Sequence, residues 1–204
     1  MRPAAAFEKT IRKLLASRQE INRTLAGSQQ ARTAREDALQ GLYLIGVRSF
    51  EAFLEDQIIQ LATGVVRWPS RIIRGARERH ENRLAERRPP MVKAILLGGK
   101  DYVDFLPYER SETAARLLFR GGRPYTLLDD HSRQALTRCL RVRNYIAHRS
   151  EFAKSKYLKS YQQVKPMITR APSPIKYLDD HIRLGVTMFE NDLTQLHSIS
   201  RFLS

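Results

Sequence analysis

Apolar residues recur every three or four positions through most of this chain, which is the spacing of one face of an α-helix. The spacing predicts a first helix from Ala4 to about Leu25, ending near Gly27, and a longer second helix from about Ala31 to Thr63, ending at Gly64. The buried side of the second helix is expected to hold Ala38, Leu42, Ile45, Phe50, Phe53, Leu54, Ile58 and Leu61.

Proline and glycine divide the middle of the chain into shorter segments. Pro89-Pro90 is expected to break a basic helix, and Gly98-Gly99 is expected to open a loop. Ser111 is expected to cap a short helix that ends near Phe119. A longer helix is expected from about Leu127 to His148.

The end of the chain predicts one more long helix, at about residues 177–203. Pro166, Pro172 and Pro174 make the stretch from Lys165 to Lys176 a loop before it. No strand pattern occurs in the sequence, so the predicted fold class is all-α: an up-and-down helical bundle with additional short helices, in which residues 1–204 form a single domain. The apolar positions of this closing helix are Leu178, Ile182, Val186, Phe189, Leu193 and Leu196.

A short internal echo places two aspartates before a histidine twice, in Leu128-Asp129-Asp130-His131 and in Leu178-Asp179-Asp180-His181. Aspartate and histidine are common metal ligands, but consecutive side chains point in different directions. Both copies fall where a long helix is expected to begin, and aspartate at a helix start accepts hydrogen bonds from free backbone amides. The favoured interpretation is helix capping, and no metal site is predicted.

The charge balance of the chain indicates a binding partner. The chain of 204 residues holds 36 Lys and Arg against 21 Asp and Glu, a formal net charge of +15. That excess indicates a polyanion, most simply nucleic acid, although a solvated basic surface without a ligand is the alternative. The most basic run is residues 67–90, which is either an RNA-backbone surface or a mobile charged arm. Its arginines at helical spacing are Arg67, Arg71, Arg74 and Arg77.

Cysteine content and hydropathy restrict the location of the protein. Cys139 is the single cysteine, so a disulfide framework and a cysteine-based metal site are excluded. No apolar run is long enough to span a bilayer, and residues 1–9 contain no long apolar segment of a secretion signal. We therefore expect a reduced, cytoplasmic protein that does not cross a membrane.

The helix expected from Leu127 to His148 ends in Arg143-Asn144-Tyr145-Ile146-Ala147-His148. Guanidinium binds phosphate through paired donors, and imidazole exchanges protons near neutral pH. At about 100° per residue, Arg143 and His148 lie about 140° apart around an ideal helix. Either the helix distorts near its end, or a second copy of the chain completes the site across a two-fold axis. The core stripe of this helix is expected to be Ala135, Cys139, Val142 and Ile146.

The same stretch resembles the signature of the HEPN superfamily (higher eukaryotes and prokaryotes nucleotide-binding domains). That signature is an Arg, usually followed by a polar residue, and a His four to six residues beyond the Arg, late in a helical bundle. Arg143, Asn144 and His148 match it, and Phe50-Glu51-Ala52-Phe53-Leu54 is also similar to the family. The resemblance covers about residues 38–152. It implies a homodimeric, metal-independent endoribonuclease without a cofactor, whose Arg and His residues from both protomers line a cleft at the interface.

The resemblance also implies a biological role. It indicates a toxin of a toxin-antitoxin pair or an effector of antiviral (phage) defence, held in check by a partner protein. In a subset of the family, a Tyr two residues after the His is modified by a partner enzyme. Here Ser150 occupies that position, so this mode of control is not expected in its usual form, and Ser150 becomes a candidate modification site.

The expected chemistry is attack of a ribose 2′-hydroxyl on the adjacent phosphate. Arg143 is expected to neutralise charge on the phosphorane, and His148 to act as general base or acid. Asn144 is expected to orient His148 or to donate to a phosphate oxygen. Glu51 is expected to orient Arg143 or His148, although a surface ion-pair cluster with Arg48 is the alternative.

Basic residues continue beyond His148, interleaved with aromatic ones. Arg149 is predicted to contact RNA together with the arginines of the basic run. Phe152, Tyr157 and Tyr161 lie among cations and are able to stack bases, but burial in the core is the alternative for Phe152 and Tyr161. For the whole chain, the alternatives to a nuclease are a non-catalytic helical RNA- or nucleotide-binding module and a subunit that binds an acidic protein.

Overall fold

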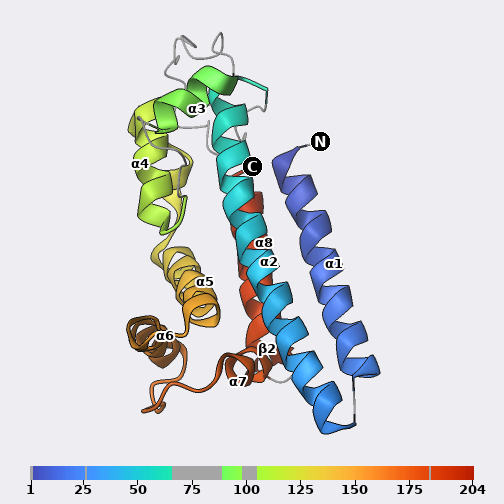
Figure 1. The fold of residues 1–204 in the computed structure, drawn as a ribbon. Helices are drawn as coiled ribbons and strands as arrows, with labels where there is room; N and C mark the ends of the chain where they lie inside the picture. Colours follow the sequence, from blue (N-terminus) through green and yellow to red (C-terminus); the bar gives the residue numbers. More distant parts are fainter. Residues whose placement is uncertain (1, 26, 66–88, 98–104, 184) are drawn as a thin grey trace.

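Two long antiparallel helices build one side of the molecule (Figure 1). The computed structural model describes residues 2–25, 27–65, 89–97, 105–183 and 185–204. Helix α1 is Pro3–Thr24 and helix α2 is Gln29–Ala62, so both long helices predicted from the apolar spacing are confirmed. Gly27 turns the chain between them with a φ of 129°. The Ser28 side chain then accepts a hydrogen bond from the Ala31 amide at the start of α2.

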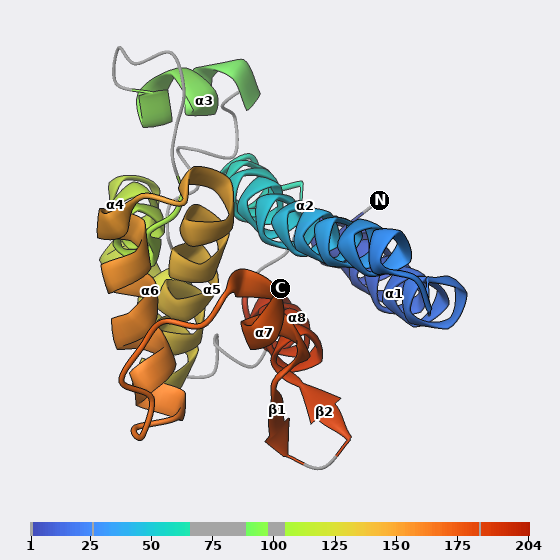
Figure 2. The same cartoon turned by 60° about the horizontal axis from the view of Figure 1, so that its bottom comes forward.

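Shorter helices and one small hairpin follow α2. They are α3 (Pro89–Leu97), α4 (Tyr108–Leu118), the 3-10 turns η2 (Arg120–Gly122) and η3 (Tyr125–Leu127), α5 (Asp130–His148), α6 (Glu151–Val164), α7 (Pro174–Asp179), β1 (His181–Arg183), β2 (Val186–Thr187) and α8 (Met188–Phe202). α8 lies alongside α1 and α2, α5 packs against α2 and α8, and α6 covers α5 (Figures 1 and 2). The predicted all-α class is confirmed.

Helix α2 is central to a hydrophobic core whose buried residues form one cluster. Phe50 and Phe53 pack against Phe7 of α1, with ring centroids 5.5 and 5.7 Å away. At Gly46 a Cβ would come within 2.6 Å of a leucine of α8, so glycine permits the close approach of these helices. Ile45, expected in the core, is 50% exposed. Because α2 packs against neighbours on several sides, its buried positions do not follow one stripe.

The predicted closing helix of residues 177–203 is wrong in its first part. The chain forms α7 and then the antiparallel hairpin β1–β2, and α8 begins only at Met188. Gly185, with a φ of 75°, lies in the turn of the hairpin. The Thr187 side chain accepts a hydrogen bond from the Glu190 amide, and the Glu190 carboxylate accepts one from the Thr187 amide. This reciprocal cap starts α8 at Met188, although the apolar spacing begins about ten residues earlier and predicted a longer helix.

The two Asp-Asp-His copies have different roles. Asp129 caps α5 as predicted, because its carboxylate accepts a hydrogen bond from the Ser132 amide at 2.7 Å. The capping prediction is wrong for the second copy, where Asp179 ends α7 and pairs with Arg35 at 2.9 Å. Its neighbour Asp180 pairs with a lysine at the end of α6. In the described residues, no group of three or more His, Cys, Asp or Glu side chains is placed to hold a metal ion.

The middle of the chain differs from expectation at its capping residues. Pro89 and Pro90 form the first turn of α3, where proline is tolerated. Pro107 occupies the N-cap of α4, and the buried Ser111 hydroxyl instead donates to the Phe105 carbonyl at 2.6 Å.

Within the described part of the chain, no helix combines the length and apolar character that a bilayer span requires. Outside the described residues lie the loop expected from Gly98 and the arginines Arg67, Arg71, Arg74 and Arg77.

A buried carboxylate joins four helices. Asp192 on α8 is fully buried and accepts hydrogen bonds from the hydroxyls of Tyr43 on α2 and Tyr177 on α7, at 2.8 and 2.7 Å. Arg138 on α5 donates to the same carboxylate from Nε and Nη2, at 3.1 and 2.8 Å. Burial and then the Asp192 charge raise the pKa of both tyrosines well above its usual value, so their hydroxyls stay protonated as donors.

Asp192→Ala is expected to lower the free energy of unfolding by about 3–5 kcal/mol, because the Arg138 guanidinium would stay buried without its counter-charge. Tyr177→Phe removes one hydrogen bond to a charged group and should cost about 1.5–3 kcal/mol. Asp37→Ala removes an exposed acid from α2 and should be nearly neutral. Urea unfolding followed by circular dichroism compares the three. An Asp192→Ala loss no larger than that of Asp37→Ala would contradict a stabilising role for this network.

Candidate functional site

Helix α5 carries the Arg-Asn-His motif at its C-terminal end. The predicted core stripe of this helix is confirmed, because its members are buried: Ala135, Cys139, Val142 and Ile146. Arg143 and Asn144 lie half-buried beside the stripe, and His148 is exposed in the last turn. All three motif residues therefore belong to one end of one helix.

Asn144 holds Arg143. Nη1 of Arg143 donates to Oδ1 of Asn144 at 2.9 Å. The bond uses the amide oxygen, which leaves the two N–H donors of the Asn144 amide for other partners. The expected roles of Asn144, orienting His148 or donating to a phosphate oxygen, stay predictions, and the amide nitrogen is the group that would perform them.

His148 stands at a tight corner between α5 and α6. Arg149 follows it with left-handed backbone angles, φ 49° and ψ 22°, and the Arg149 amide donates to the Tyr145 carbonyl at 3.1 Å. Ser150 then caps α6, since its hydroxyl accepts a hydrogen bond from the Ala153 amide at 3.2 Å. The short connection places the His148 side chain on the outside of the corner, where it is open to solvent.

Arg149 anchors this corner to α2. Nη2 of Arg149 donates to Oε1 of the buried Gln40 at 2.8 Å. Nε2 of Gln40 in turn donates to the Glu36 carbonyl at 3.1 Å. Guanidinium has five N–H donors, so the contact with Gln40 leaves donors for an anion. Arg149 thus has a structural contact besides the RNA contact predicted for it.

The carboxylates considered as partners of the motif lie on α2. Glu55 pairs with Lys93 of α3 at 2.9 Å, so its ion pair joins α2 to α3. Glu51 is half-buried one turn earlier on the same helix. Its expected role in orienting Arg143 or His148 stays a prediction.

The three aromatic residues of α6 separate into two kinds. Tyr157 and Tyr161 are buried in the core, where their rings pack near Tyr177. Phe152 is 74% exposed, and the Lys156 ammonium lies 5.4 Å from the centre of its ring. Core burial therefore holds for Tyr161, whereas Phe152 presents an accessible aromatic face in the first turn after the corner.

The geometry of α5 bears on one of the two expectations for the motif. The helix is regular through His148, so the expected distortion near its end does not occur. Arg143 and His148 therefore stay about 140° apart around the axis. Completion of the site by a second copy of the chain stays a prediction.

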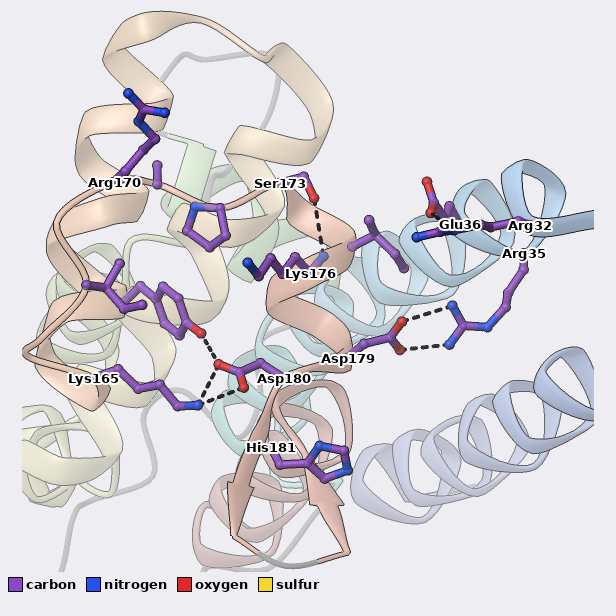
Figure 3. A pocket seen from close by; sticks show the side chains of 15 residues that line it. Arg32, Arg35, Glu36, Lys165, Arg170, Ser173, Lys176, Asp179, Asp180 and His181 are labelled. Atoms are coloured by element: carbon purple, nitrogen blue, oxygen red, sulfur yellow. Dashed lines mark hydrogen bonds and ion pairs between the residues drawn. The ribbon is translucent and has the colours of Figure 1, made fainter. Parts of the chain in front are cut away.

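A hollow on the neighbouring surface was not predicted. It measures about 850 Å³ and lies between the start of α2, the loop after α6, α7 and the first residue of β1 (Figure 3). No local sequence signal marks it, because its walls come from segments far apart in the chain and meet only through the packing of α7 on α2. The lysines and arginines that line it are Arg32, Arg35, Lys165, Arg170 and Lys176.

Comparison of the chain with protein-family models, with curated proteins and with solved structures found no match. Functional assignment therefore rests on the residues and their geometry. The two sites that they define are the corner at His148 and the hollow beside α7.

Arg149→Gly is expected to leave the protein more stable than Arg149→Ala by about 1 kcal/mol, because only alanine keeps a Cβ in left-handed backbone. Both substitutions remove the bond to Gln40, so the comparison isolates the backbone. Ala147→Gly, at an ordinary helical position, is the control and should destabilise. Urea midpoints measure the differences, and equal stability of the two Arg149 variants would contradict strain at this residue.

Proposed function

We propose that this protein is a metal-independent endoribonuclease of the HEPN type that cuts single-stranded or looped RNA. The observation that carries the proposal is the end of α5, where Asn144 holds Arg143 and His148 is exposed one turn later. These residues occur at the spacing of the family signature on a helical bundle. The net charge of +15 supports a polyanionic substrate.

The reaction follows from the chemistry of the two side chains. His148, as general base, takes the proton from a ribose 2′-hydroxyl, and the oxygen attacks the adjacent phosphorus. Arg143 donates hydrogen bonds to the phosphorane oxygens as negative charge develops. The bond from phosphorus to the 5′ oxygen then breaks, and that oxygen takes a proton from an imidazolium. The products are a 2′,3′-cyclic phosphate and a 5′-hydroxyl.

The proposed active site lies at the interface of a homodimer. A regular α5 directs Arg143 and His148 away from one another. An isologous interface at this corner brings a second Arg143 and a second His148 to the same cleft, so that each phosphate meets a cation from one protomer and an imidazole from the other. The two histidines then divide the roles of base and acid.

Residues around the corner support contact with the rest of the strand. Arg149 and the lysines of α6 supply positive charge for phosphates. Phe152 offers its exposed ring to a base. In this proposal the arginines of residues 67–88, which lie outside the described residues, are further contacts to the RNA backbone, as the sequence predicts.

The biological role in the proposal is that of a cytoplasmic toxin or phage-defence effector, which an antitoxin or another partner restrains. Ser150 is the position that carries a modified Tyr in some family members. Its hydroxyl accepts the hydrogen bond that starts α6, directly beside His148. A modification of that oxygen would remove the cap and move the corner that holds the imidazole.

A non-catalytic RNA- or nucleotide-binding module is the second candidate. The separation of Arg143 and His148 around α5 favours it, because a single chain does not direct both at one phosphate. In that case Arg143 and His148 are structural residues, and His148 takes no part in proton transfer. Cleavage distinguishes the two candidates, since RNA binding is common to both.

His148→Ala is expected to lower the rate of RNA cleavage in EDTA by about 10²–10⁴-fold, because the general base is lost. His131→Ala is the matched control, since His131 is an exposed histidine in the first turn of the same helix. The control should cleave at the parental rate. Gel analysis of an end-labelled RNA with one 2′-deoxy position measures both the rate and the need for the 2′-hydroxyl.

Three results would contradict the nuclease proposal. The first is loss of all cleavage when EDTA is added, which would show that the chemistry needs a metal. The second is cleavage at the 2′-deoxy position. The third is equal cleavage by the parent and His148→Ala, provided that circular dichroism and size-exclusion chromatography show the same helicity and oligomeric state.

Phe152→Ala is expected to weaken binding of single-stranded RNA by about 5- to 150-fold, which corresponds to roughly 1–3 kcal/mol for one stacked base. Leu117→Ala is the matched control, because Leu117 is a 65% exposed apolar residue on α4. Fluorescence anisotropy with a labelled oligonucleotide in EDTA measures both affinities. Equal affinity of the two variants would exclude Phe152 as a stacking residue.

A further inference from the structure

The hollow beside α7 has the size of a ligand site. Its volume of about 850 Å³ falls within the range of pockets that hold small organic molecules, about 300–1,000 Å³. An inorganic ion would fill only a small part of it. The volume of the hollow therefore fits a ligand as large as a nucleotide.

The acidic residues that line the hollow are already paired. Burial opposes the charge on Asp180, but hydrogen bonds from Lys165 and Tyr161 lower its pKa below the usual value, so this carboxylate stays ionised beside its partners. Figure 3 marks the contacts of Asp179 and Asp180 along the walls. The pairs are Arg32–Glu36 at 3.4 Å, Arg35–Asp179 at 2.9 Å and Lys165–Asp180 at 2.7 Å.

Arg170 and Lys176 add positive charge that no lining acid balances. Both side chains are exposed, and neither forms an ion pair among the residues drawn in Figure 3. Lys176 extends from α7 toward the loop that carries Arg170. An excess of cations at the opening repels metal ions and cationic ligands and attracts phosphate groups.

An apolar wall accompanies these cations. It is formed by half-buried side chains of the loop after α6 and of α7: Ile168, Ala171, Pro172 and Ile175. Simple anions such as phosphate gain nothing from apolar surface. A nucleotide has both a charged phosphate and a flat, weakly polar base, so it matches a wall of this kind with cations at its edge.

The α2 wall of the hollow continues to the corner at His148. Arg32, Glu36 and Gln40 are spaced by four residues and therefore lie along one face of α2. The first two line the hollow, and Gln40 accepts the hydrogen bond from Arg149. Glu36 and Gln40 are separated by roughly 6 Å along the helix axis. A single strand leaving the corner therefore reaches the hollow within a short distance.

We infer that this hollow binds a nucleotide of the same RNA strand, beside the cleaved one, with Arg170 and Lys176 on its phosphates and the apolar wall against its base. The inference rests on the proposed function for the choice of RNA as the polymer. It makes the hollow a positioning subsite, separate from the residues that carry the cleavage chemistry.

Binding of a labelled single-stranded RNA in EDTA tests the inference. Every variant carries His148→Ala, so that affinity is measured without cleavage. The test variant is Arg170→Glu with Lys176→Glu, and the charge-matched control is Lys9→Glu with Lys13→Glu at exposed positions of α1, neither of which lines the hollow. A milder pair, Arg170→Ala with Lys176→Ala, repeats the test with a smaller change of charge.

The Arg170→Glu, Lys176→Glu variant (the pocket variant) is expected to bind RNA at least tenfold more weakly than the Lys9→Glu, Lys13→Glu control at the same salt concentration. Losing two phosphate contacts should also lower the slope of log affinity against log salt by about 1.4, while the control keeps the parental slope. Equal affinity and equal slope for pocket and control variants would overturn the inference. RNA cleavage by the parent protein is measured separately. If the Arg170 and Lys176 substitutions weaken RNA binding but the parent protein does not cleave RNA, the nuclease proposal is contradicted and the RNA-binding subsite is supported.

A free nucleotide offers the same phosphate and base groups as an RNA strand and is the other ligand that would fit the hollow. Calorimetric titration with adenosine and uridine 5′-monophosphates distinguishes the two sources. Competition of these nucleotides with RNA only at millimolar concentration supports a subsite for part of a strand. Micromolar binding of a mononucleotide that needs Arg170 and Lys176, with RNA affinity unchanged in the pocket variant, would overturn the RNA inference and assign the hollow to a free nucleotide.

Discussion

The fully buried carboxylate of Asp192 constrains the way in which four helices meet. Its oxygens receive two tyrosine hydroxyls and one guanidinium, from α2, α7 and α5. A buried charge is tolerated only when its hydrogen bonds are satisfied, so small shifts of any of these helices carry a large free-energy cost. The network therefore specifies the position of α5 relative to α2, and through it the place at which the motif reaches the surface.

The motif itself lies at the C-terminal end of that helix. Arg143 and Asn144 are bonded to each other beside the core, whereas His148 occupies the last turn and is open to solvent. The left-handed Arg149 and the Ser150 cap turn the chain at once into α6, and the Gln40 contact fastens the turn to α2. A firmly held corner with an exposed imidazole combines a fixed position with access for a large ligand.

Positive charge is used in two ways on this surface. Some cations serve the fold, as Arg35 does with Asp179 and Lys165 does with Asp180. Others, among them Arg170 and Lys176, project from the same region without a carboxylate partner among the drawn residues. In the proposed function, the cations of the second kind are the ones that contact phosphate groups.

Local signals in the sequence were sufficient for the long helices, for the Asp129 cap and for the core stripe of α5, because each depends on residues within a few turns of one another. The spacing of Arg143 and His148 likewise follows from the sequence alone. The apolar spacing predicted a helix wrongly at residues 177–187. There the Thr187–Glu190 cap starts the helix later, and Asp179 forms an ion pair with a distant helix.

Tertiary structure alone decided which equivalent-looking residues serve the core and which face the solvent. Phe152 and Tyr161 lie on the same helix among similar neighbours, yet one is exposed and the other buried, since burial depends on the helices packed beside them. The hollow beside α7 has the same origin. Arg32 and Lys176 are far apart in the chain, and only the packing of α7 on α2 brings them to one surface.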